Sequence, residues 1–319
     1  MKTIVLGPPG TGKTTTLLNE VDKYLKQTDP DKIGYFSFTQ KAAYEARDRA
    51  MSKFNLSEDD LPYFRTLHSL AFRRLGIKKD EVMQRRHYED LGRKMGLIVD
   101  YHEYDNEHTG LFTTKSDLLR IVQIAKLRGI TPEQQYNLKE HTQDITVYQL
   151  KQFVHDLDQY KKDYNLIDFT DMITEFVKSD KSPKFDVVFI DEAQDLSPIQ
   201  WKMYDELKKK SKHIVLAGDD DQAIYGWAGA DVERFQKEPG KEIVLPKSYR
   251  VPQSIQSIAN KILDRIPDER RILKTWQPRK ETGNIYPESY SLQEIPVQDG
   301  NWLILARTNY RLINLMPDL

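Results

Sequence analysis

The sequence predicts an α/β fold in which helices cover both faces of a parallel β-sheet. Short apolar stretches recur along the 319 residues, and most of them are uninterrupted rather than alternating. Such stretches are typical of strands that are buried on both faces of a sheet. Helical segments follow several of the stretches, and this strand-then-helix repetition indicates a doubly wound sheet.

The expected strands and helices follow one another along most of the chain. Each expected strand is an apolar stretch closed by polar or glycine-rich residues, and these stretches cover residues 3–7, 33–38, 185–191, 213–219, 242–246 and 301–307. The clearest helical segments that follow strands cover residues 13–25, 40–51, 198–209 and 252–264.

The strand pattern disappears between residues 76 and 165. This part is charged, rich in helix formers and broken by short polar turns, so it indicates a helical insertion between two strands of the core. A new α/β region begins after residue 245. We therefore expect a first core domain from residues 1–75 and 166–245, an insertion from residues 76–165, and the start of a second core domain at residues 246–319.

The composition excludes several classes of protein. Hydrophobic residues make up 39% and charged residues 30%, and the net charge of −1 argues against a wholly basic surface but leaves room for a local basic groove. The chain has no cysteine, which excludes disulfides and thiolate metal sites. The first apolar run is too short for a signal peptide, and no stretch approaches the roughly 18 apolar residues of a membrane span. We expect a soluble, cytoplasmic chain without a membrane partner.

The stretch GPPGTGKT, from Gly7 to Thr14, matches the phosphate-binding loop pattern G-x-x-x-x-G-K-[ST]. It follows an expected strand and opens an expected helix, which is the context the pattern requires. Glycines let backbone N–H groups face an anion, Lys13 can reach terminal phosphates, and the Thr14 hydroxyl can hold Mg²⁺. The expected nucleotide contacts are Gly7, Pro8, Pro9, Gly10, Thr11, Gly12, Lys13, Thr14 and Thr15.

The stretch VVFIDEAQD supplies two carboxylates at the end of an expected strand. Asp191 would hold Mg²⁺ through water, and Glu192 beside it would activate the attacking water. Two solvated acids at a strand end are the alternative interpretation.

Six motifs together resemble the UvrD/Rep-type superfamily 1 DNA helicases in their order and approximate spacing. They are GPPGTGKT, FSFTQKAA, TLHSLAFRRL, IDEAQD, GDDDQAIYGWAGAD and LPKSYR. The resemblance covers most of the chain apart from the helical insertion. It implies a RecA-like P-loop NTPase sheet with a helical insertion and a partial second RecA-like domain. It also implies a monomer that uses ATP and Mg²⁺ to move 3′-to-5′ along single-stranded DNA and at single-strand/double-strand junctions.

The resemblance implies roles for individual residues. Gln222 resembles the glutamine that senses the γ-phosphate, Tyr249 the tyrosine that stacks on adenine, and Arg250 the arginine that reaches the γ-phosphate from the second core domain. With Lys13 and Glu192, Gln222 and Arg250 form the expected catalytic set. The residues expected along the single-stranded DNA track are Phe38, Thr39, Thr66, His68, Tyr225 and Trp227.

Each assignment has a structural alternative. Tyr249 and Arg250 would otherwise be an interface aromatic and a surface ion-pair partner. The three adjacent aspartates 219–221 could suggest a separate metal cluster, but adjacent side chains rarely point the same way, so we expect Asp219 in the Mg²⁺–water network. Small neighbours of Trp227 should leave its ring free to stack on bases, and the alternative buries it against the insertion. The remaining alternatives are core packing for Phe38 and His68, and helix capping for Thr39 and Thr66.

Departures from the family pattern change some expectations. The chain starts close to the phosphate loop, without the upstream glutamine that reads adenine, so Tyr249 becomes the main expected base contact. It stops before the last helicase motifs, from which we expect little strand separation and slow ATP turnover. Gly226 and Ala228 stand where many relatives carry arginines. Two other functions fit the same motifs: an ATP-driven switch that binds a protein partner without translocating, and a non-catalytic DNA-binding remnant.

Overall fold

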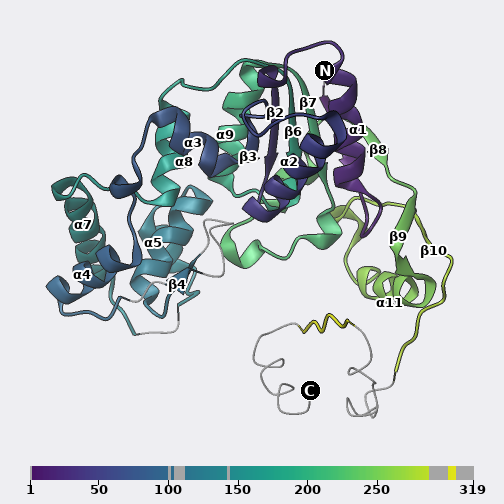
Figure 1. Cartoon of the computed structure of the whole chain (residues 1–319). Helices are drawn as coiled ribbons and strands as arrows, with labels where there is room; N and C mark the ends of the chain where they lie inside the picture. The colour runs from purple at the N-terminus through teal and green to yellow at the C-terminus, as the bar shows by residue number, and fades with distance from the viewer. Residues whose placement is uncertain (1, 100–101, 104–111, 142–143, 287–300, 307–319) are drawn as a thin grey trace.

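The structure is a computed structural model that describes residues 2–99, 102–103, 112–141, 144–286 and 301–306. Its centre is a six-stranded parallel sheet with the order β3-β2-β6-β7-β1-β8 (Figure 1). This sheet confirms the predicted fold class. The strands are β1 (Lys2–Leu6), β2 (Ile33–Ser37), β3 (Phe64–Thr66), β6 (Phe185–Asp191), β7 (Ser211–Gly218) and β8 (Lys241–Val244).

Apart from the exposed edge strand β8, both faces of the sheet are buried, which explains why these strands are apolar without interruption. Successive side chains of a strand point to opposite faces. In β1, Ile4 and Leu6 pack into one apolar cluster and Val5 packs into the other. Leu216 and Ala217 of β7 divide between the same two clusters.

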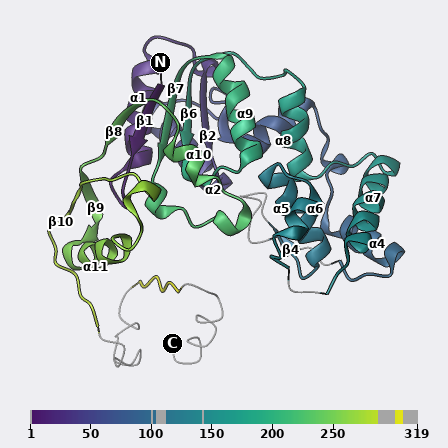
Figure 2. The same ribbon diagram turned by 180° about the vertical axis from the view of Figure 1, so that it is seen from behind.

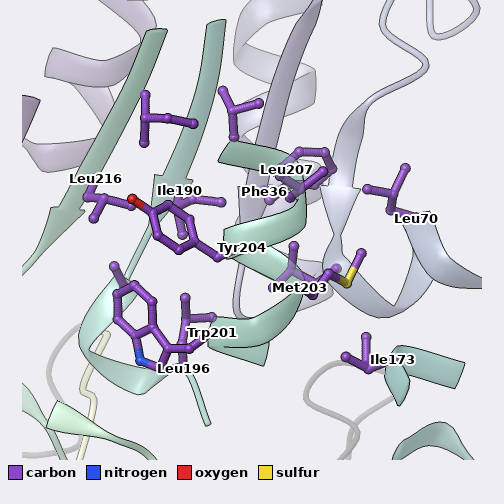
Figure 3. Packing of buried hydrophobic residues seen from close by; sticks show 14 of the residues in the cluster. Phe36, Leu70, Ile173, Ile190, Leu196, Trp201, Met203, Tyr204, Leu207 and Leu216 are labelled. Atoms are coloured by element: carbon purple, nitrogen blue, oxygen red, sulfur yellow. The ribbon is translucent and has the colours of Figure 1, made fainter. Parts of the chain in front are cut away.

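Helices cover the two faces separately. The first face carries α1 (Lys13–Leu25) and α2 (Gln40–Phe54), and the second carries α3 (Leu67–Leu75), α8 (Phe169–Lys178), α9 (Pro198–Lys209) and α10 (Val232–Gln236). Figure 3 shows Trp201 and Tyr204 of α9 packed with Ile190 and Leu216 of the sheet. The expected helices at 13–25 and 198–209 are confirmed, and the helix expected at 40–51 continues to residue 54. None of the helices in the described ranges is long and apolar enough to cross a bilayer.

The expected helical segment between β3 and β6 is present and has its own apolar core. It contains α4 (Arg85–Met95), α5 (Asp117–Arg128), α6 (Pro132–Asn137) and α7 (Val147–Asp163), which lie to one side of the sheet in Figures 1 and 2. A short antiparallel pair, β4 (His102–Glu103) and β5 (Phe112–Thr113), was not expected from the sequence. The chain also contains short 3₁₀ helices, η1 (Pro30–Lys32), η2 (Lys79–Glu81), η3 (Ala193–Asp195), η4 (Asp220–Gln222), η5 (Gly226–Ala228) and η6 (Asp268–Arg270).

A buried ion-pair network ties this helical segment to α8. The Lys126 ammonium lies 2.7 Å from both Asp168 and Asp171, and Lys161 lies 2.7 Å from Asp171. Burial alone would raise the pKa of Asp168, but the two lysines hold it well below its ordinary value. The network holds α5 and α7 against α8, which packs on the sheet. Removing one partner would leave a buried charge unpaired, which is strongly destabilising.

The chain after β8 forms a smaller unit beside the sheet, with β9 (Lys247–Pro252), α11 (Gln253–Leu263) and β10 (Gln277–Arg279). β9 and β10 pair in parallel. The strand expected at 301–307 is wrong for residues 301–306, which have no regular structure and leave Leu303 82% exposed; residue 307 lies outside the described residues. A strand needs a neighbouring ladder to satisfy its backbone groups, and no described strand pairs with these residues.

Candidate functional site

The loop between β1 and α1 has the backbone of an anion-binding turn. Gly10 and Gly12 have φ values of 72° and 83°, a left-handed region that favours glycine. Gly7 has no room for a side chain, because a Cβ there would lie 2.0 Å from Cγ of Lys13. Thr11 closes the turn by donating from Oγ1 to the Pro8 carbonyl at 2.7 Å. Pro9 lies in the same turn, and Thr15 is exposed on the first turn of α1.

Lys13 points back along the loop from the first turn of α1. Its Nζ lies 3.1 Å from the Gly7 carbonyl oxygen and 3.4 Å from Oε2 of Glu192. The side chain is almost fully buried. The loop, the cation and the acid that the sequence predicted separately therefore meet at one point.

Asp191 ends β6 directly opposite Thr14. The Thr14 hydroxyl donates to Oδ2 of Asp191 at 3.0 Å, and the Tyr35 hydroxyl donates to the same oxygen at 2.9 Å. Burial, with a smaller effect from Glu192, raises the pKa of Asp191 to about 6. A hydroxyl beside a carboxylate offers the oxygen ligands that Mg²⁺ prefers, so Thr14 and Asp191 fit the predicted metal site.

Glu192 has a left-handed backbone, with φ 54° and ψ 46°. This conformation is strained for a residue other than glycine, and it persists mainly where the surrounding structure fixes it. Gln194 donates from Nε2 to Glu192 at 3.1 Å, and Lys13 faces the same carboxylate oxygen. Burial, followed by the Glu192 charge, raises the pKa of Asp195 to about 7. Glu192 is thus held partly exposed, beside the phosphate loop and within an acidic environment.

Gln222 connects the acidic turn to the phosphate loop. Its Nε2 lies 2.6 Å from Oδ2 of Asp219 and 3.4 Å from the Gly7 carbonyl oxygen. Asp219, which the sequence analysis expects in a Mg²⁺–water network, forms an ion pair with Lys274 through Oδ1 at 2.7 Å. The carboxylates of residues 219–221 do point the same way, with ligand oxygens within 4.8 Å of one another, since η4 turns them toward one cation.

Strand β9 places two predicted nucleotide residues at the edge of the loop. The Tyr249 N–H donates to the Gly10 carbonyl at 2.9 Å, and the Ser248 hydroxyl donates to the Pro9 carbonyl at 2.7 Å. Tyr249 is 70% exposed. A Cβ on Gly10 would lie 2.3 Å from Cβ of Arg250, so the arginine stands directly over the loop. Ser248 is a contact that the sequence analysis missed.

Three of the residues expected on the DNA track form a row of rings. The Phe38 and Tyr225 centroids are 5.0 Å apart, and those of Tyr225 and Trp227 are 6.4 Å apart. Phe38 is buried, which fits the core alternative, whereas Trp227 is 59% exposed. The alternative that buries Trp227 against the helical insertion is therefore wrong. Instead, Gly229 of the same turn approaches α5, where a Cβ would lie 3.4 Å from Arg128.

The other expected DNA residues lie on neighbouring elements but outside this row. The Thr39 and Thr66 hydroxyls accept N-cap hydrogen bonds from Ala42 and Ser69, as the capping alternative expects. The His68 ring contacts Phe169 with centroids 6.0 Å apart. Burial lowers the pKa of His68 to about 4, so its imidazole is neutral at pH 7.

Arg65, beside Thr66, was also missed by the sequence analysis. Its side chain is buried and lies 3.3 Å from the Ser69 hydroxyl. Burial, with a smaller contribution from Arg73, lowers the pKa of Arg65 to about 10. A buried arginine gives no signal in a single sequence, because arginines are usually exposed.

Comparison with known proteins places this sequence beside DNA helicases. A sequence model of the UvrD/REP helicase N-terminal domain matches residues 1–241. The ATP-dependent DNA helicase Rep of Buchnera aphidicola subsp. Acyrthosiphon pisum is 27% identical over 82% of this chain and 42% of its own length. DNA helicase II of Haemophilus influenzae is 28% identical over 82% of this chain and 38% of its own length. The matched region thus spans about two fifths of these curated relatives.

Proposed function

Because this chain belongs to the UvrD/Rep helicase family, we propose that it hydrolyses ATP and couples hydrolysis to movement along single-stranded DNA. The observation that carries the proposal is the convergence of Lys13, Glu192 and β9 on one phosphate-binding loop. The relatives named as ATP-dependent DNA helicases support both the nucleotide and the nucleic acid. We also propose that this chain acts at junctions between single-stranded and double-stranded DNA.

The domain organisation that goes with this function has three parts. We assign residues 1–75 and 166–245 to a first RecA-like domain, residues 76–165 to a helical insertion, and residues 246–319 to the start of a second RecA-like domain. The separate apolar core of the helical segment supports the insertion. The parallel β9/β10 pair beside the main sheet supports the second domain.

In the proposed reaction, the loop and Lys13 hold the phosphates of ATP, and Tyr249 supplies a flat surface for the base. Thr14 and Asp191 would hold Mg²⁺, which would neutralise charge on the phosphate oxygens. Glu192 accepts a proton from the attacking water, while Gln222 and Arg250 face the γ-phosphate. A permanently charged guanidinium suits this position, because it stabilises the charge that spreads over the transferred phosphoryl group.

The DNA track in this proposal follows the row of rings. Tyr225 and Trp227 are exposed enough to stack on bases, and such stacking tolerates any sequence because every base has a π-face. The Phe38 ring packs against the Tyr225 ring. Thr39, Thr66 and His68 lie on neighbouring elements. Gln222 and Trp227 lie in the same short segment, which contains η4 and η5. A movement of Gln222 on ATP hydrolysis would therefore shift the ring that stacks on the bases.

The deciding experiment compares ATP hydrolysis with and without oligo-dT. We expect the purified chain to hydrolyse ATP faster when oligo-dT is present, and Glu192→Gln to bind ATP without hydrolysing it. Hydrolysis that oligo-dT leaves unchanged would favour the protein-partner switch. ATP and oligo-dT binding without any hydrolysis would favour the DNA-binding remnant.

A further inference from the structure

A single buried lysine is surrounded by three consecutive aspartates. The Nζ of Lys274 lies 2.7 Å from Oδ1 of Asp219 and 3.0 Å from Oδ2 of Asp221, and it also contacts Oδ1 of Asp220. The lysine side chain is only 1% exposed. A cation buried this deeply is stable only with well-placed partners, so the position of Lys274 is tightly fixed.

The residues before Lys274 bind the same turn. Arg271 forms an ion pair with Asp221 at 2.9 Å, and the Ile272 N–H donates to Oδ2 of Asp220 at 2.7 Å. Gln236 of α10 joins Asp220 to the Arg270 carbonyl. We call residues 270–274 the clasp segment. It belongs to the chain beyond β9, whereas the three aspartates belong to the end of β7 and to η4.

Asp219 transmits this contact to the phosphate loop. One of its carboxylate oxygens accepts from Lys274, and the other accepts from Nε2 of Gln222 at 2.6 Å. The same Nε2 lies 3.4 Å from the Gly7 carbonyl oxygen. Because the amide group is planar, a fixed nitrogen also fixes the direction of the amide oxygen. Lys274 therefore sets the carboxylate, and the carboxylate sets the Gln222 side chain.

We propose that the clasp segment is a positioning element for the γ-phosphate: Lys274 fixes Asp219, and Asp219 holds the Gln222 amide at the phosphate loop. This inference rests on the proposed ATPase function and adds to it residues that do not touch the nucleotide. The region after β8 would then act on the nucleotide site in two ways. Arg250 stands over the loop directly, and Lys274 acts through Asp219.

Substitution of Asp219 by asparagine tests the link with little change of shape. The new amide nitrogen would face either Lys274 or Gln222, and both present donors, so one hydrogen bond must be lost. Asp221→Asn is the matched control. It removes the same charge from the same turn and also weakens a Lys274 contact, but Asp221 makes no side-chain hydrogen bond to Gln222 among the described residues.

The measurement is equilibrium binding of fluorescent ADP and of a non-hydrolysable ATP analogue to the full 319-residue chain, with thermal unfolding recorded for each variant. We expect the parent to prefer the triphosphate analogue. Asp219→Asn should reduce this preference about tenfold, the effect of one hydrogen bond to a charged group. Asp221→Asn should lose clearly less of the preference, because it leaves the Asp219–Gln222 hydrogen bond in place. In a Gln222→Ala background, Asp219→Asn should cause no further loss, because its effect passes through Gln222.

Lys274→Met should reproduce the loss seen with Asp219→Asn, and Lys274→Arg should restore part of it. If Lys274→Met fails to fold, the comparison of Asp219→Asn with Asp221→Asn still tests the positioning role. A parent-like preference in Asp219→Asn, an equal loss in Asp221→Asn, or additive losses with Gln222→Ala would each overturn the positioning role alone. A parent chain that binds neither nucleotide would overturn the proposed function itself.

Discussion

Trp227 offers the sharpest test of the proposed DNA track. Truncation to alanine removes a largely exposed side chain whose ring centroid lies 6.4 Å from that of Tyr225. Gly226 beside it has open space around the position of a side chain. We therefore expect Trp227→Ala to remove a stacking surface while leaving the fold intact.

The expected loss of stability follows from the exposed fraction of Trp227. An enclosed tryptophan buries about 200 Å². With 59% of Trp227 exposed, the buried part is roughly 80 Å², which at about 25 cal/mol per Å² gives at most about 2 kcal/mol. A fully buried tryptophan would cost about 3–5 kcal/mol. One lost base-stacking contact should instead weaken single-strand binding by about 1–3 kcal/mol.

The assay is fluorescence anisotropy with labelled oligo-dT, together with urea unfolding of the same protein. Trp201→Phe serves as the matched control, since Trp201 is buried in the core and donates to the Asp231 carbonyl at 3.3 Å. That variant should lose stability and keep its oligo-dT affinity. A Trp227→Ala protein with a large drop in stability and unchanged oligo-dT binding would refute the reasoning.

Other predictions concern the nucleotide site and its surroundings. Lys13→Ala should abolish tight Mg·ATP binding, measured by calorimetry, while Glu192→Gln should keep binding and lose hydrolysis. Burial raises the pKa of Asp195 to about 7. The free energy of unfolding should therefore fall as the pH rises from about 4 to about 7, because the unfolded chain ionises in this range while the folded carboxyl keeps its proton. Asp195→Asn should flatten that dependence in urea titrations. Thr39→Ala should cost about 1 kcal/mol as a lost N-cap, and Thr39→Ser should not; an equal loss in both would count against capping.

The parts of the fold that depend on local pattern could be predicted from the sequence. The phosphate loop and α1 follow from glycine spacing and from the strand before them, and the sheet follows from stretches that are apolar on both faces. β3 was missed because it has three residues, Phe64–Thr66, too few to form a pattern. The strand expected at 301–307 was wrong for 301–306 because apolar character alone does not provide a partner strand.

The candidate site divides in the same way. Lys13, Thr14, Asp191 and Glu192 belong to short motifs, and the structure brings all four together. The partner of Asp219 could not be predicted, because Lys274 lies far along the chain and its contact depends on how the region after β9 packs. A buried charge selects its partner in three dimensions, which a one-dimensional pattern does not encode.

The packing of β9 against the phosphate loop orients the backbone groups of the loop, even where β9 itself would contact no ligand. A carbonyl oxygen directed at a phosphate repels it, and each oxygen from Gly7 to Gly10 already accepts a hydrogen bond within the protein. Two of these donors, the Ser248 hydroxyl and the Tyr249 N–H, come from β9. In a trans peptide the N–H points opposite to the preceding C=O, so holding the Pro9 oxygen outward turns the Gly10 N–H inward. The electrostatic polarity of the loop is therefore shared between two distant parts of the chain, and separating β9 from the loop would weaken its attraction for any phosphate.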